Sequence, residues 1–118
     1  MNQFNLSDGT YFRYTERGEG PCLLLLHTIR NRIEYYDRLS PLLIKKFKVI
    51  CIELPGHGDS PINKKTNYNI EFITNSIVEF IDQKQLEDIT IAGESIGAVS
   101  VSYTHLRAHE TPEHLVCR

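Results

Sequence analysis

The chain has 118 residues, which is enough for one domain at most. Its 41% hydrophobic and 24% charged residues exclude a disordered or fibrous protein. The net charge of −2, with both signs interspersed along the chain, gives no strongly basic surface for nucleic acid or for an anionic membrane.

The lack of a recognisable targeting signal and the placement of the cysteines predict a cytoplasmic protein. The N-terminus has neither the basic start nor the apolar core of a signal peptide. The longest apolar run, Cys22–Leu26, is too short to cross a bilayer. No two cysteines have the C-x-x-C spacing, and Cys22 and Cys51 lie in apolar runs, where a thiol acts as a small hydrophobic side chain. We therefore expect neither a disulfide nor a membrane partner.

The first expected elements are a hairpin and two buried strands. Segments 3–6 and 11–14 flank the turn signal Ser7-Asp-Gly9, which predicts a β-hairpin. The run 22–26 is continuously apolar, as in a strand that is covered on both faces of a parallel sheet. Segment 48–53 has the same character and is expected to be a second such strand.

Between these strands, residues 34–46 are expected to form a helix. The spacing of Tyr35, Leu39, Leu42 and Leu43 predicts one apolar stripe facing the core. Pro41 lies inside this pattern, so we expect a kink there or a second helix start near Ser40.

The second half of the chain continues the alternation of helix and strand. Residues 54–67 are rich in Pro, Gly and Asn and predict a loop. A periodic helix follows, marked by Ile70, Ile73, Ile77, Phe80 and Ile81, with Asn67 or Asn69 as its N-cap. A strand from Ile89 then leads to Gly93. Strands that alternate with helices predict an α/β fold with a parallel sheet.

A nucleophile-elbow motif follows this last strand. Gly93-Glu-Ser-Ile-Gly97 fits the pattern G-x-S-x-G, in which a serine lies at a sharp turn between a strand and a helix. The glycines on either side remove Cβ atoms that would collide across the turn.

Two further motifs lie at strand ends upstream of the elbow. Leu23-Leu-Leu-Leu-His27 ends the first buried strand, and Glu53-Leu-Pro-Gly-His-Gly-Asp-Ser60 follows the second. With the elbow, these motifs resemble the α/β-hydrolase superfamily, specifically its esterase-like branch, over roughly residues 1 to 100. The resemblance implies an N-terminal portion of the α/β-hydrolase fold.

The resemblance also implies roles for individual residues. Ser95 matches the nucleophile, and the backbone N–H groups of Ile96 and Ile29 match the donors of the oxyanion hole. His27 and His57 match residues that organise loops, and His57 is not the histidine of the triad. In this fold the acid and the histidine follow the serine in the chain, so we expect both beyond residue 118. The 118-residue chain alone is therefore expected to be inactive.

This chain departs from the family pattern at two positions. Thr28 stands where the family has a glycine, so the backbone there must avoid positive φ. Glu53 stands where the family usually has aspartate, a residue that ties its loop down, and we expect the longer glutamate to do the same.

Cofactor and metal sites are not expected. Gly56-x-Gly58 lacks the third glycine of a dinucleotide fingerprint, because Pro61 stands there and no helix opens. His109-Glu110 would need a histidine at position 113 to form H-E-x-x-H, and that position holds Glu113.

The last residues do not fit the pattern that precedes them. Residues 101–118 are polar, carry three of the five histidines and break at Pro112. Val101 to Thr111 resembles one reading frame of a transposon-end sequencing adapter. We therefore expect a truncated hydrolase domain over 1–100 and a non-native tail over 101–118, which would leave the sheet edge after residue 93 open.

The sequence thus predicts a serine hydrolase of a small-molecule carboxylic ester or thioester, acting through an acyl-enzyme at Ser95. The alternative is a non-catalytic binding protein that keeps the same scaffold.

Overall fold

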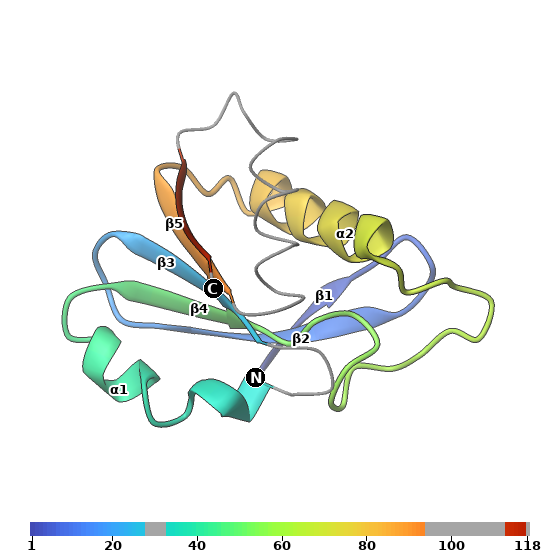
Figure 1. Ribbon diagram of the computed structural model, residues 1–118, viewed down its shortest axis with the longest axis horizontal. Coiled ribbons are helices and arrows are strands. Elements are labelled where there is room, and N and C mark those ends of the chain that lie inside the picture. The colour runs from blue at the N-terminus through green and yellow to red at the C-terminus, as the bar shows by residue number, and fades with distance from the viewer. Residues whose placement is uncertain (28–32, 94–112, 118) are drawn as a thin grey trace.

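A single mixed β-sheet lies at the centre of the protein (Figure 1). The computed structural model describes residues 1–27, 33–93 and 113–117, and for Tyr35 and residues 113–117 it describes the backbone only. Within these ranges the sheet has six strands in the order β1-β2-β4-β3-β5-β6. They are β1 (Asn2–Asn5), β2 (Tyr11–Arg17), β3 (Cys22–Leu26), β4 (Lys48–Ile52), β5 (Ile89–Gly93) and β6 (Glu113–Cys117).

The strand directions confirm the predicted hairpin and parallel sheet. β1 and β2 pair antiparallel across the turn at Gly9, and β2 continues antiparallel to β4. β4, β3 and β5 run parallel to one another. Leu26 pairs with both Ile52 and Gly93, so these three strands end level with one another at the same edge of the sheet.

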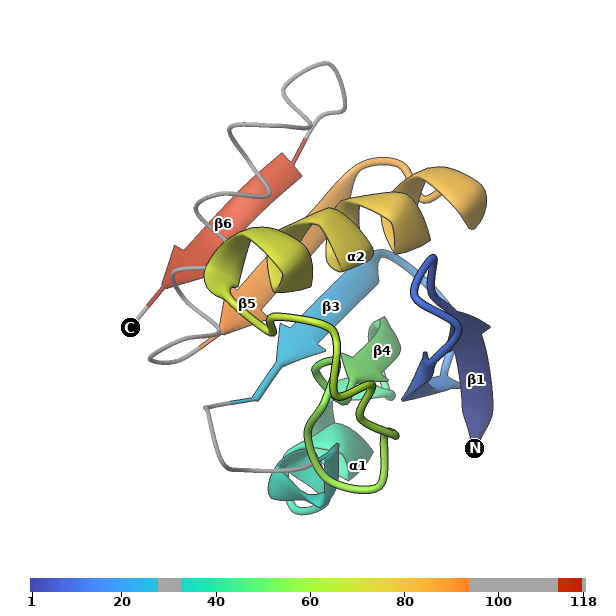
Figure 2. The same cartoon turned by 90° about the vertical axis from the view of Figure 1, so that its right-hand side faces the viewer.

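Helix α2 (Ile70–Gln83) lies across one face of the sheet, as Figure 2 shows. Its first turn is capped by Asn69, whose Oδ1 accepts a hydrogen bond of 2.9 Å from the Phe72 N–H; this satisfies a donor that a helix start leaves free. Of the two predicted caps, the structure therefore uses Asn69. The predicted apolar positions of the helix pack on the sheet, with Ile73, Ile77, Phe80 and Ile81 all buried.

The opposite face carries two short helical pieces across the segment predicted to be helical, 34–46. A 3₁₀-helix η1 (Ile33–Tyr36) is followed by α1 (Ser40–Leu43), with Pro41 in the first turn. Proline has no N–H and clashes with the preceding turn, so a helix starts anew at Ser40, which confirms the second start predicted there. The predicted apolar stripe is also broken, because Leu39 and Leu42 are 44% and 64% exposed.

Side-chain alternation explains why the strands are apolar throughout. Leu24, Leu26, Ile50 and Ile52 belong to the core beneath α2. Their neighbours Leu23, Leu25, Val49 and Cys51 form a second core with Ile33 and Tyr36. A strand buried on both faces has no polar side to alternate with, as expected for a parallel sheet covered by helices.

Strand β6 was not expected from the sequence. Residues 113–117 pair parallel to β5, with Ile89 opposite Glu113 and Gly93 opposite Cys117. β6 therefore pairs along the side of β5 that does not contact β3, which the sequence predicted to be an unpaired edge strand. The reason lies in the backbone, because the edge of a strand offers unpaired N–H and C=O groups to any extended segment. The non-native origin of 101–118 stays a prediction.

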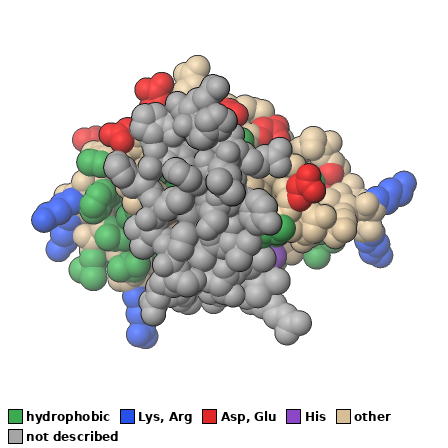
Figure 3. Space-filling view, turned by 45° about the horizontal axis from the view of Figure 1, so that its top comes forward, with side chains coloured by type: hydrophobic (Ala, Val, Ile, Leu, Met, Phe, Trp, Pro, Cys, Tyr) green, Lys and Arg blue, Asp and Glu red, His purple; other side chains and the backbone are tan. Residues whose placement is uncertain are grey.

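The surface has two features relevant to partners. On the face drawn in Figure 3, the coloured Lys and Arg side chains stand in separate groups around the outline and not in one patch. No helix among the residues described is both long and apolar enough for a membrane crossing.

An aromatic cluster joins the hairpin to α2 and gives a direct test of this packing. The Phe80 ring lies 5.1 Å from Phe4, 5.4 Å from Phe12 and 4.9 Å from Tyr14 between ring centroids. We expect Phe80→Ala to lower the free energy of unfolding by about 3–5 kcal/mol, through lost burial and a residual cavity. Urea denaturation followed by circular dichroism measures this.

The control for Phe80→Ala is Ile62→Ala, at a side chain that is 64% exposed. Its effect is expected to stay within about 0.5 kcal/mol. Equal effects of the two substitutions would contradict the packing described.

Candidate active site

The carboxyl ends of β3, β4 and β5 lie at one edge of the sheet, and each of the three sequence motifs begins or ends there. His27 directly follows β3, Glu53 directly follows β4, and the elbow motif starts at the last residue of β5. In open α/β sheets, ligands bind outside the carboxyl ends of the strands. Ser95, Ile96 and Ile29 lie outside the described residues, so their roles stay predictions.

The buried carboxylate of Glu53 joins four parts of the chain. Its side chain is fully buried and accepts hydrogen bonds from Arg13 Nε at 2.7 Å and Arg13 Nη2 at 2.8 Å. The backbone N–H groups of Asp59 and Ser60 donate to Oε1 at 3.0 and 3.1 Å, and the Ile33 N–H donates to Oε2 at 3.2 Å. The carboxylate thereby links β2, the end of β4, the loop after β4 and the start of η1.

These partners keep Glu53 ionised despite its burial. Burial raises the pKa of this carboxyl group, but the hydrogen bonds from Arg13, Ile33 and Ser60 and the charge of Arg13 together outweigh it and lower the pKa to about 2. The same contact raises the pKa of Arg13. A bidentate pair of this kind combines charge with fixed geometry. The result is an ion pair that stays charged at neutral pH although the carboxylate is buried.

Gly58 is needed to make room for this carboxylate. Its φ of +54° lies in the left-handed region, and a Cβ atom at this position would collide with the carboxylate of Glu53. Glycine is the residue that tolerates both constraints. The glycines of the Pro55-Gly-His-Gly58 sequence therefore have a packing role as well as a turn role.

His27 and His57 lie side by side at the edge of the sheet. His27 is fully buried, and its Nε2 accepts a hydrogen bond of 2.9 Å from the Leu54 N–H. An accepting Nε2 carries no proton, which places the proton of the neutral ring on Nδ1. The His57 ring centroid lies 5.5 Å from that of His27, and its Nδ1 lies 3.1 Å from the Pro55 carbonyl oxygen. The two predicted loop residues are thus brought together.

The sequence analysis missed two residues of this edge, Arg13 and Tyr36. Arg13 pairs with Glu53 across 40 positions of the chain, and nothing in its alternating strand marks it as a charge partner. Tyr36 is buried, and its hydroxyl donates to the Leu26 carbonyl oxygen at 2.6 Å.

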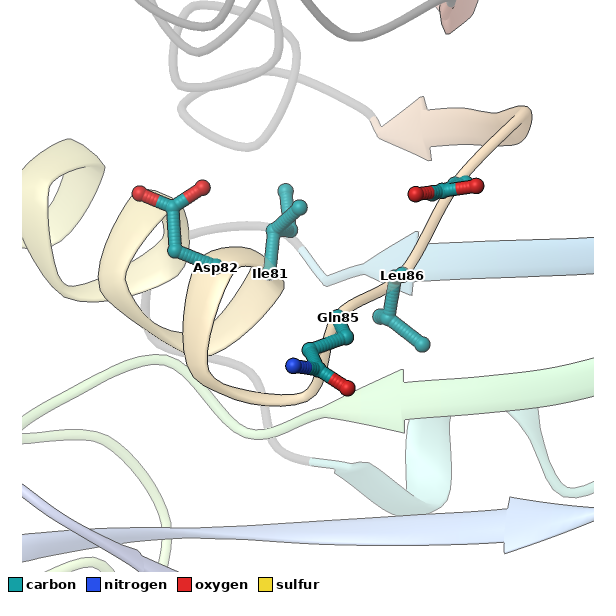
Figure 4. A pocket seen from close by; sticks show the side chains of 5 residues that line it. Ile81, Asp82, Gln85 and Leu86 are labelled. Carbon is teal, nitrogen blue, oxygen red and sulfur yellow. The ribbon is translucent and has the colours of Figure 1, made fainter.

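A surface depression of about 550 Å³ lies away from this edge (Figure 4). It is lined by Ile81, Asp82, Gln85, Leu86 and Glu87, which form the end of α2 and the turn before β5. This turn enters the amino end of β5, opposite to the carboxyl ends at which the predicted site lies. The depression is therefore not part of the candidate active site.

Replacing Glu53 tests whether the ion pair holds this edge together. We expect Glu53→Gln to lower the free energy of unfolding by about 3–5 kcal/mol, because it leaves Arg13 charged without its buried partner. Glu34→Gln is the matched control, since Glu34 contacts the same Arg13 at 3.5 Å but is 43% exposed. The control is expected to cost less than about 1 kcal/mol, and an equal loss in both variants would contradict the central role of Glu53.

The low pKa of Glu53 also predicts how stability depends on pH. The unfolded chain takes up this proton near the ordinary pKa of 4.5, whereas the folded protein does so only near 2. The contribution is therefore complete above pH 4.5 and is lost as the pH falls toward 2, by on the order of 3 kcal/mol. Urea titrations between these pH values measure it, and the same loss in Glu53→Gln would assign it to other groups.

Comparisons with known proteins agree with this architecture. The sequence profile described as the alpha/beta hydrolase fold matches residues 21–115. A solved hydrolase from Pseudomonas aeruginosa superimposes with a TM-score of 0.89 at 24% identity, covering 98% of this chain and 44% of that one, which shows the same fold.

Two curated relatives show the range of related proteins. The chain is 37% identical over 57 residues to a fluoroacetate dehalogenase of Burkholderia, covering 47% of this chain and 19% of that protein. It is 25% identical over 99 residues to a pimeloyl-[acyl-carrier protein] methyl ester esterase of Aeromonas hydrophila, covering 84% of this chain and 37% of the esterase. The chain thus spans less than two-fifths of either relative. With the profile match, the parallel strands and their motif-bearing ends, these likenesses show that the chain belongs to the alpha/beta hydrolase fold family.

Proposed function

We propose that this chain carries the nucleophile of a serine hydrolase that cleaves a carboxylic ester or thioester through an acyl-enzyme. The supporting observation is the register of the parallel strands, in which Leu26 of β3 lies opposite Gly93 of β5. The chain therefore leaves β3 toward Ile29 and β5 toward Ser95 at the same edge of the sheet and at the same level. A nucleophile and an oxyanion hole must converge in this way.

In the proposed reaction, the Ser95 hydroxyl attacks the substrate carbonyl while a histidine takes its proton. The backbone N–H groups of Ile29 and Ile96 stabilise the negative oxygen that forms, and collapse expels the alcohol or thiol, which takes the proton back from the histidine. Water then releases the acid by the same steps. In this fold the acid and the histidine follow the serine in the chain.

The relatives bear on the substrate in opposite directions. The Aeromonas protein is named as an ester hydrolase, which supports an ester substrate. The Burkholderia protein is named as a dehalogenase. The resemblance to the α/β-hydrolase superfamily implies an aspartate at the nucleophile position of its haloalkane dehalogenases. Position 95 is a serine, which favours ester or thioester cleavage over dehalogenation.

Labelling with a fluorophosphonate tests the proposal in the full-length protein. We expect the probe to modify Ser95, because it reacts with serines that a neighbouring base activates. Ser95→Ala should abolish labelling, with a loss of roughly a thousandfold or more. Ser100→Ala, a serine outside the motif, is the control and should label like the unchanged protein. Mass spectrometry of the labelled peptide identifies the site.

Two results would refute the proposed function. Full labelling of Ser95→Ala would mean that another residue is the nucleophile. A folded full-length protein that is not labelled at all would favour the non-catalytic binding protein as the second candidate.

A further inference from the structure

The two flanks of segment 28–32 are both held by the end of β4. On the N-terminal side of the segment, His27 Nε2 accepts a hydrogen bond of 2.9 Å from the Leu54 N–H. On the other side, the Ile33 N–H donates to Glu53 Oε2 at 3.2 Å. His27, Leu54 and Glu53 are all fully buried, and Ile33 is 4% exposed. Consecutive residues at one strand end thus bond to both flanks of the segment.

A third bond closes the same stretch of chain. The Tyr36 hydroxyl donates to the Leu26 carbonyl oxygen at 2.6 Å in a buried setting. Because Leu26 ends β3 and Tyr36 ends η1, this bond limits the separation of the flanks.

Glu53 is built to hold its side of this arrangement rigidly. Arg13 donates hydrogen bonds to both carboxylate oxygens, and the N–H groups of Asp59 and Ser60 donate to Oε1. Oε2 is thereby held between the Arg13 Nη2 and the Ile33 N–H. A contact with several fixed partners positions a backbone group far better than a flexible surface contact.

We propose that Glu53 is a positioning residue for the oxyanion hole, acting through the Ile33 N–H on the segment that carries Ile29. The inference rests on the proposed function. An oxyanion donor is effective only when it is held about 2.7–3.1 Å from the developing charge, so small displacements lower the rate. Because this charge exists in the transition state and not in the bound substrate, the loss falls on kcat and not on KM.

The length of Glu53 is part of this inference. Aspartate, the usual family residue at this position, is shorter by one carbon–carbon bond of about 1.5 Å. Without a backbone shift, a carboxylate withdrawn by that distance does not reach Ile33 and Arg13 together at the spacing found here. Glu53→Asp therefore keeps the carboxylate charge but not all of the contacts that Glu53 makes, and it serves as a second variant beside Glu53→Gln.

The test combines kinetics with amide hydrogen exchange in the full-length protein. For Glu53→Gln, and for Glu53→Asp if the first variant does not fold, we expect kcat for a p-nitrophenyl ester to fall about 10–100-fold, with KM changed less than about threefold. Peptides covering residues 27–33 should exchange roughly tenfold faster or more. Phe80→Leu, in the core on the opposite face, is the control; it lowers stability and should change neither kcat nor this exchange.

The outcomes separate this inference from the proposed function. Unchanged kcat in a folded Glu53 variant, unchanged exchange over 27–33, or equal changes in Phe80→Leu would each overturn the positioning role. If the unchanged protein shows no labelling that depends on Ser95, the proposed function fails. In that case, the hydrogen exchange of residues 27–33 in the Glu53 variants, compared with the unchanged protein, still tests whether Glu53 holds this segment.

Discussion

The buried ion pair between Glu53 and Arg13 is the interaction on which the functional edge of this protein depends. Burial alone would favour a neutral carboxylic acid, and an unpaired buried charge would be strongly destabilising. Arg13 and the surrounding N–H groups reverse this preference, so that the pKa of Glu53 lies at about 2. Those donors come from separate segments, so burying this charge depends on the tertiary fold that brings the segments together.

This dependence joins the hairpin to the parallel part of the sheet. Arg13 lies on β2, next to β4 in the sheet, and its backbone carbonyl accepts the Glu53 N–H at 2.9 Å. The Arg13 N–H in turn donates to Ser60 Oγ at 3.2 Å. The N-terminal hairpin is therefore more than an added edge, because it supplies the counter-charge that fixes the loop beside the candidate site.

The parts of the fold that follow from local rules were predictable. The hairpin turn at Gly9, the apolar strands and the periodic helix α2 each have a signal within a few residues. Two features were not predicted, one for a local reason and one for a non-local reason. The apolar spacing at Leu39 and Leu42 predicts a buried stripe, but Pro41 restarts the helix and both side chains are exposed. β6 depends on the free edge of β5 and has no strong signal of its own.

By itself, the sequence determined the fold family and the candidate nucleophile, because strand ends and the glycine–serine pattern around Ser95 are properties of short segments. Only the tertiary structure decided which charges are paired. In the folded chain, Arg13 and the Ile33 N–H both donate hydrogen bonds to the Glu53 carboxylate. The His27 and His57 rings lie next to each other. The reason is physical: segment-level patterns arise from neighbours along the chain, whereas the partners of a buried polar group are set by which strands the sheet brings together.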